Sequence, residues 1–187
     1  MTQNDFIDKI HKRLSIVSVG ASALRNQGAS GIVDIARDYF YQSISLDDYF
    51  EKLSSPDKFR KFLDDHTVKL LQSFPTDGKS WGAARKGLNL FLRETVYSKF
   101  ISDHFKLPTD LNDFNNLIRN LEVPLDFDVA TGIYKDRNGT IPKWISIKKL
   151  TENVSDIYQR EALAISQSKK IARVHLDLLY WRQRETK

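Results

Sequence analysis

The chain has 187 residues and no cysteine, and its 29 Lys and Arg residues outnumber its 24 Asp and Glu residues. The length suits one domain with a proper core, and the lack of cysteine excludes disulfides, zinc–thiolate sites and cysteine-ligated iron–sulfur clusters. No apolar run approaches the roughly 18 residues of a membrane span, and residues 1–5 do not resemble a secretory signal. We therefore expect one cytoplasmic, monomeric domain over residues 1–187 that does not enter a membrane.

The excess positive charge lies in the last quarter of the chain. Residues 1–142 hold 19 basic and 19 acidic residues, whereas residues 143–187 hold 10 basic and 5 acidic ones. A basic segment suits contact with phosphate groups. A solvated tail is the alternative interpretation.

Hydrophobic residues recur at helical intervals through most of the first half, and no segment alternates as a half-buried strand would. In chain order, we expect helices over residues 4–18 and 32–41, a short helix capped by Ser45, and a helix opened by Ser55 and Pro56 that continues to Phe74. A turn follows at residues 75–78. The predicted fold class is all-α.

The second half shows the same periodicity. After Lys86 a buried stripe is expected from Leu88, Phe91, Leu92, Val96 and Phe100, and a second face from Lys86, Leu90, Arg93 and Tyr97. Next come a helix over 111–120 capped by Thr109 or Asp110, a surface loop over 137–142, and a long helix from Tyr158 to Trp181.

Residues 78–84, with the sequence GKSWGAA, form a glycine-bearing turn ahead of an apolar helix. Small residues would let backbone N–H groups approach a phosphate, and the start of the following helix adds positive potential. Simple capping of a helix end by glycine is the alternative.

Lys86 is predicted to lie in the first turn of that helix, where a cation opposes the helix dipole. The dipole and Arg85 both favour a neutral amine, which could attack C1′ of a nucleotide and form a Schiff base. An ordinary surface lysine is the alternative.

Asp126 follows Pro124 and precedes an apolar helical start. As an N-cap its carboxylate would accept backbone N–H bonds and stay ionised, which suits the stabilisation of an oxocarbenium-like sugar. The alternative is an aspartate that only caps a helix.

Arg173, Asp177 and Trp181 are spaced to share one helix face. An aromatic ring and a carboxylate could stack on an extruded base and bond its edge. A surface pair of Arg173 and Asp177 beside a core tryptophan is the alternative.

Together these segments resemble the helix-hairpin-helix DNA glycosylases. WGAARKGLNLFL is similar to their hairpin and following helix, usually L-P-G-V-G-x-K-T-A, and VPLDFDVA is similar to their V-D-x-x-V segment. HLDLLYW resembles the H-[IL]-D-x-x-L-W segment of the archaeal 8-oxoguanine glycosylases, a branch without an iron–sulfur cluster. The resemblance spans residues 75–181. Trp81-Gly82-Ala83-Ala84 departs from Pro-Gly-Val-Gly, and the interval from Lys86 to Asp126 is longer than usual.

The resemblance implies a helical bundle in two lobes around a cleft for DNA and an extruded base, with the hairpin near residues 75–88. It implies that Lys86 is the Schiff-base lysine and Asp126 the catalytic aspartate. The base pocket would be formed by Asp177, Trp181, Arg93, Asn26 and Gln27, and the DNA backbone would be held by Lys79, Ser80, Gly82, Ala84 and Arg85.

We thus expect an enzyme that extrudes a damaged or modified base of DNA and cleaves its N-glycosidic bond, in repair or in defence against phage DNA. No metal or organic cofactor is expected for the chemistry, although the hairpin could hold a monovalent cation. Attack by Lys86 would add β-lyase activity, whereas attack by water would leave an abasic site. A non-catalytic helix-hairpin-helix DNA-binding module and a helical protein-interaction domain are the rival interpretations.

Overall fold

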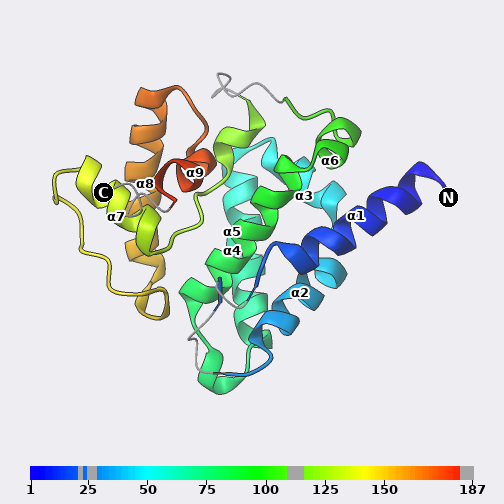
Figure 1. Cartoon of the computed structure of the whole chain (residues 1–187), viewed down its shortest axis with the longest axis horizontal. Helices are drawn as coiled ribbons and strands as arrows, with labels where there is room; N and C mark the ends of the chain where they lie inside the picture. Colours follow the sequence, from blue (N-terminus) through cyan, green and yellow to red (C-terminus); the bar gives the residue numbers. More distant parts are fainter. Residues whose placement is uncertain (21–22, 25–28, 109–115, 182–187) are drawn as a thin grey trace.

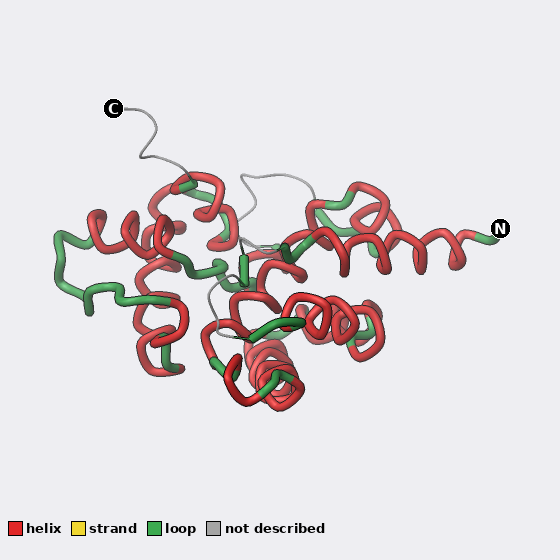
Figure 2. Tube along the Cα trace, turned by 60° about the horizontal axis from the view of Figure 1, so that its bottom comes forward, coloured by secondary structure: helices red, strands yellow, loops and turns green. Residues whose placement is uncertain are grey.

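The computed structural model describes residues 1–20, 23–24, 29–108 and 116–181, and this part of the chain is helical, without any strand (Figures 1 and 2). The predicted all-α class is confirmed. The first helices are α1 (Gln3–Val17), α2 (Ile32–Ser43), α3 (Leu46–Leu53) and α4 (Pro56–Ser73), followed by the short 3-10 helix η1 (Thr76–Gly78). The central helix is α5 (Trp81–Tyr97), and α6 (Lys99–His104) follows it.

The rest of the chain consists of short elements around one long helix. They are η2 (Leu117–Asn120), α7 (Phe127–Asp136), η3 (Ile147–Lys149), α8 (Glu152–Lys169), η4 (Arg173–His175) and α9 (Leu176–Tyr180). The extended stretch between η2 and α7 carries the chain from α5 and its neighbours to α7–α9 (Figure 1).

Several helix starts form for the reasons that the sequence suggested. The Ser45 hydroxyl accepts the Asp48 N–H and so caps α3, and Pro56 occupies the first turn of α4, where its missing N–H is not needed. Asp126 precedes α7 and caps it. The predicted N-cap positions of Ser45 and Asp126 are therefore confirmed.

Four predicted details are wrong. Helix α5 begins at Trp81, so Lys86 lies in its second turn rather than its first. The long helix from Tyr158 ends at Lys169, because Lys170 adopts a left-handed conformation with φ of 55°. Phe100 belongs to α6 and is 55% exposed, so it does not extend the buried stripe of α5.

The fourth wrong detail concerns residues 117–120, which form a 3-10 helix instead of the end of an α-helix. The proposed caps Thr109 and Asp110 and residues 111–115 lie outside the described residues.

The buried apolar side chains form two clusters. The larger cluster draws on α1 to α6 and η2, and includes the stacked rings of Phe40 and Phe91, 4.9 Å apart. The smaller one draws on α7, α8 and α9, with Tyr158 and Leu176 fully buried. Helix α5 packs against α4, α1 and α2 and also meets η3 and α8. It therefore contributes to one cluster and borders the other.

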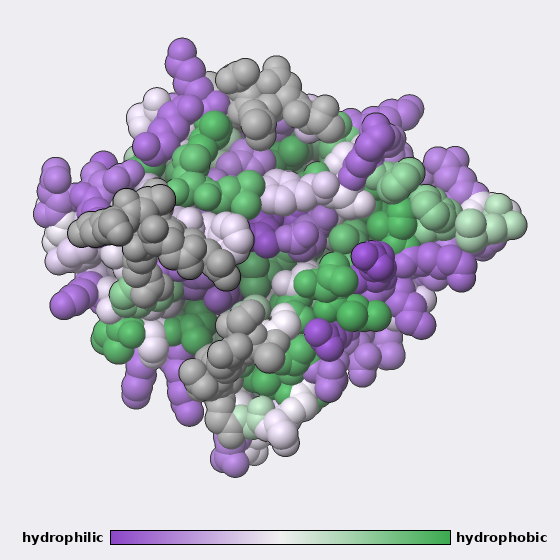
Figure 3. Space-filling view, viewed as in Figure 1, coloured by the Kyte–Doolittle hydropathy of each residue, from purple (hydrophilic) through white to green (hydrophobic). Residues whose placement is uncertain are grey.

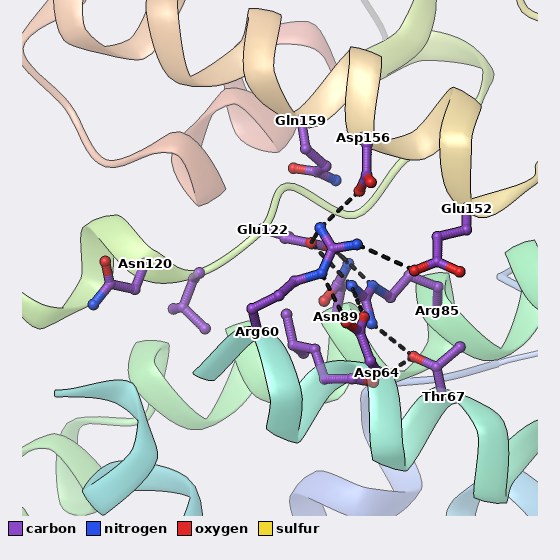
Figure 4. A network of polar contacts seen from close by, with 12 residues as sticks. Arg60, Asp64, Thr67, Arg85, Asn89, Asn120, Glu122, Glu152, Asp156 and Gln159 are labelled. Carbon is purple, nitrogen blue, oxygen red and sulfur yellow. Dashed lines mark hydrogen bonds and ion pairs between the residues drawn. The ribbon is translucent and has the colours of Figure 1, made fainter. Parts of the chain in front are cut away.

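A network of charged side chains lies between α4, α5, α8 and the stretch after η2 (Figure 4). At its centre, Arg85 of α5 donates to Glu122 over 2.9 Å, and both side chains are at most 4% exposed. Arg85 also donates to Asp64 and Thr67 of α4. Arg60 of α4 reaches Asp156 and Glu152 of α8.

Burial alone would raise the pKa of Glu122, but the charges of Arg85 and Arg173 and the hydrogen bonds from Arg85 and Asn89 outweigh it and lower that pKa. The carboxylate is therefore ionised at neutral pH. The stability that it contributes is present above pH 4.5, its ordinary pKa, and is lost as the pH falls through its lower value in the folded chain.

We predict that Glu122→Gln lowers the free energy of unfolding by about 3–5 kcal/mol at pH 7, because Arg85 would lose its buried counterion and keep only the partly exposed Asp64. Urea unfolding measures this loss, and the difference from wild type should shrink at acid pH. Glu51→Gln is the control, since it removes a carboxylate from the exposed pair with Lys52 and should change stability little. Equal losses in the two variants would contradict a central role for the Arg85–Glu122 pair.

Candidate active site

Lys86 and Asp126, 40 residues apart in sequence, lie side by side. The Lys86 ammonium is 3.5 Å from Oδ2 of Asp126, and the two side chains are 11% and 33% exposed. Lys86 projects from α5, which belongs to the larger apolar cluster, whereas Asp126 opens α7, which belongs to the smaller one. The pair thus joins the two parts of the core at a partly solvated position.

The start of α7 holds the carboxylate of Asp126 in one orientation. Its Oδ1 accepts the backbone N–H groups of Asp128 and Val129, each over 3.0 Å, while Oδ2 faces Lys86. The N–H groups at a helix start have no partner within the helix, so one oxygen of Asp126 satisfies them. The other oxygen is left for the ion pair with Lys86. Asp126 therefore presents a fixed negative charge to the Lys86 amine.

A pocket of about 350 Å³ opens beside this pair. Its walls include Lys86, Asp126, Phe127 and residues 144–147. Phe127 and Ile145 are 50% and 79% exposed, so the rim is partly apolar. The arrangement can place a small group next to an amine and a carboxylate, which are the components of nucleophilic and electrostatic catalysis at a sugar carbon.

Further along α5, the predicted second face also meets polar partners. Arg93 forms an ion pair with Asp177 of α9 and another with its neighbour Glu94. Tyr97 lies with its hydroxyl 2.8 Å from Nδ1 of His175. The side chains of Lys86, Arg93 and Tyr97, spaced at i, i+7 and i+11, therefore all face residues from the region of α7–α9.

Burial determines the protonation of the Tyr97–His175 contact. It raises the pKa of Tyr97 to about 12 and lowers the pKa of His175 below its ordinary value of 6.5. At neutral pH the phenol is protonated and the imidazole is uncharged, and a hydrogen bond joins the Tyr97 hydroxyl to Nδ1 of His175. This uncharged pair lies beside the charged pair of Arg93 and Asp177.

Most of the residues expected to hold the DNA backbone are buried. Arg85 is 2% exposed and is engaged by Glu122 and Asp64, so it does not reach a phosphate at the surface. Ser80 caps α5 by accepting the Ala83 N–H and donates to the carbonyl of Ile147.

Gly82 and Ala84 belong to α5 itself, and the Ala84 N–H is used within the helix start. A Cβ at Gly82 would lie 2.2 Å from the carbonyl oxygen of Ile147. Gly82 therefore allows close packing of η3 on α5. The structure places Arg85, Ser80, Gly82 and Ala84 in the interior rather than at a surface open to a phosphate. Lys79 is exposed.

The predicted shared face of Arg173, Asp177 and Trp181 does not form, because the helix is interrupted before it. Arg173 lies in η4 and donates to the carbonyls of Asn120, Leu121 and Gln159. It does not pair with Asp177, which corrects the alternative of a surface pair.

Trp181 is 62% exposed and lies at the end of α9, so it is not a core tryptophan. Exposed Leu178 and Leu179 precede it, and part of the apolar surface in Figure 3 lies over this helix. Asn26 and Gln27, expected in the base pocket, lie outside the described residues.

Sequence reasoning missed three contributors to this region: Glu122, the Tyr97–His175 contact, and residues 144–147. Glu122 stands four residues before Asp126, but no local pattern marks it as the partner of Arg85. The apolar residues between Lys143 and Lys148 were the one available signal for the pocket wall.

Among the described residues, no group of three or more His, Cys, Asp or Glu side chains is placed to hold a metal ion, and no helix is long and apolar enough to cross a membrane. Comparisons of this chain with protein-family models, with curated proteins and with solved structures find no match. The assignment of a function therefore rests on the geometry of the site.

We predict that Gly82→Ala destabilises the fold by about 1–3 kcal/mol, because the new methyl group would collide with the backbone of Ile147. Thermal or urea unfolding measures this loss. Gly20→Ala is the matched control, since a Cβ there meets nothing within 4 Å. A Gly82→Ala protein with unchanged stability but weaker DNA binding would instead support a phosphate contact at Gly82.

Proposed function

We propose that the protein is a DNA glycosylase that cuts a modified or damaged base from its deoxyribose. The observation that carries the proposal is the contact between Lys86 and Asp126, 3.5 Å apart at the edge of a pocket of about 350 Å³. An amine next to a fixed carboxylate suits attack on C1′ of a nucleotide, where positive charge develops as the base departs.

In the proposed reaction, Asp126 either accepts a proton from the Lys86 ammonium, which makes the amine nucleophilic, or stays ionised and stabilises the cationic sugar. The amine then forms a bond to C1′ as the C1′–N bond breaks, and the base leaves with that electron pair and takes up a proton. The C1′–O4′ bond then breaks, the ring oxygen takes up the proton that the nitrogen gives up, and an imine forms. Loss of a proton from C2′ then expels the 3′ phosphate by β-elimination. Where water attacks instead, the product is an abasic site.

The Arg93–Asp177 pair lies further along the same face of α5 and would contact the extruded base, with Trp181 at the end of α9 as a stacking surface. The two apolar clusters would then correspond to two lobes, with DNA bound along the side where Lys86 and Asp126 meet. Base specificity would depend on the hydrogen bonds that Asp177 and Arg93 can still form outside their mutual ion pair.

A DNA-binding module without activity is the competing interpretation. It has no need of a carboxylate held toward a lysine beside a pocket, since a carboxylate repels phosphate. Incubation with duplexes and single strands that carry oxidised, alkylated or hypermodified phage bases tests the proposal directly. Released base on any substrate supports a glycosylase and distinguishes repair from defence, whereas tight binding without release on all of them supports the module.

We predict that Asp126→Asn reduces base excision by about a hundredfold or more while the fold and DNA affinity remain. Asparagine is as good an N-cap as aspartate, so α7 should still form, but the charge beside Lys86 is lost. Single-turnover excision assays measure the effect. Asp34→Asn is the control, because it removes an exposed carboxylate from the first turn of α2. Full excision by Asp126→Asn would exclude Asp126 from the chemistry.

We predict that borohydride added during the reaction traps a covalent adduct between wild-type protein and DNA, and that Lys86→Ala forms none, because only a neutral primary amine gives a reducible imine. Denaturing gel electrophoresis detects the adduct. Lys99→Ala, at an 80% exposed lysine of α6, should trap as well as wild type. Base release by wild type without any adduct would show that water is the nucleophile.

A further inference from the structure

Of the five residues that the sequence suggested as DNA-backbone contacts, only Lys79 is exposed. Arg85, Gly82 and Ala84 serve the interior, and Ser80 is engaged with α5 and Ile147. DNA binding nevertheless requires cations that neutralise phosphates, since this contribution supplies most of the non-specific affinity. The surface next to the Lys86–Asp126 pocket is close enough to the proposed site to provide them.

Residues 143–149, with the sequence KWISIKK, carry three lysines and no carboxylate. Lys143, Lys148 and Lys149 are all exposed. In the described ranges none of them forms an ion pair, unlike Lys52, Lys61 and Lys99. Their charges are therefore not neutralised within the described chain and can act on a ligand.

This segment, which we call the basic segment, is also a wall of the pocket. Trp144, Ile145, Ser146 and Ile147 line the pocket together with Lys86 and Asp126. The lysines stand immediately before and immediately after these four residues. A nucleotide placed in the pocket would consequently have positive charge near the phosphates on either side of it.

The basic segment is held in place by α5. Ser80 donates to the carbonyl of Ile147 over 3.3 Å, and Gly82 allows that carbonyl to approach the helix closely. Leu150, directly after the segment, is buried in the smaller cluster. Exposed Lys79 precedes Ser80 and so adds a fourth cation from the hairpin side. A backbone anchored at both α5 and the core loses little conformational entropy on binding.

We propose that the basic segment, together with Lys79, is the surface that grips the DNA backbone on both sides of the nucleotide held at Lys86 and Asp126. This proposal rests on the glycosylase function proposed above and names its partner surface. Residues 80–85 then support the basic segment from the inside. The lysines of the basic segment, rather than residues 80–85, contact the phosphates.

The test compares two triple variants with the same net charge. The first is Lys143→Gln, Lys148→Gln and Lys149→Gln. The control is Lys9→Gln, Lys58→Gln and Lys69→Gln, which neutralises three exposed lysines of α1 and α4. Fluorescence anisotropy with a labelled duplex gives the dissociation constant at several salt concentrations, and circular dichroism melting checks that both proteins are folded.

We predict that the first variant has a shallower salt dependence. The negative slope of log K against log salt should shrink in magnitude by about two to three, because each lost phosphate contact removes about 0.9 from it. Its affinity should fall by about tenfold or more at 0.1 M salt. The control should keep the wild-type slope. Lys79→Gln alone should remove about one unit of slope.

The outcomes distinguish this proposal from the glycosylase function. Equal slopes and affinities for both triple variants, with wild type still releasing base, overturn the basic segment and leave the enzyme intact. A selective loss in the first variant, with no base released from any substrate by wild type, supports the surface and overturns the enzyme. A wild-type protein that does not bind DNA at low salt overturns both.

Discussion

The buried ion pair of Arg85 and Glu122 determines how the two halves of this chain meet. Arg85 comes from the second turn of α5, and Glu122 from the extended stretch that leads to α7. A guanidinium with 2% exposure requires carboxylate and hydroxyl partners, and Glu122, Asp64 and Thr67 supply them at 2.9 Å to 3.1 Å. Displacement of Glu122 would leave Arg85 without its buried counterion, so this stretch has one favourable position against α5.

The position of the site follows from that constraint. Lys86 is the next residue after Arg85, and in an α-helix successive side chains point about 100° apart. When Arg85 points inward toward Glu122, Lys86 points toward Asp126, which lies four residues after Glu122 and caps α7. The buried pair and the partly exposed pair are thus two contacts along one interface, and the first orients the second.

The same interface accounts for the departures from the expected hairpin. A small residue at position 82 lets the carbonyl of Ile147 reach α5, and Ser80 bonds that carbonyl while it caps the helix. Ser80 and Gly82 are small enough to contact a phosphate, but in this structure they contact the backbone of residues 146–150 instead. The phosphate-binding role that we propose moves to the exposed lysines of that same segment.

Several features were determined by the sequence alone. Apolar residues at helical spacing predicted α1 to α5, and Ser45, Pro56 and Asp126 identified helix starts, because caps and first-turn residues act through bonds within a few positions. The resemblance to glycosylases also selected Lys86 and Asp126 as a pair, and the structure brings them together. Whether they act in catalysis stays a prediction.

Only the tertiary structure decided which polar residues are buried. Arg85 and Lys86 are adjacent cations in sequence, yet one is in the core and the other borders a pocket, since burial depends on partners 37 and 40 positions away. The end of α8 at Lys169 likewise turns Arg173 toward three backbone carbonyls and separates it from Asp177. Local sequence sets helix propensity and caps, but long-range packing determines which charges can be neutralised inside and which remain for a ligand.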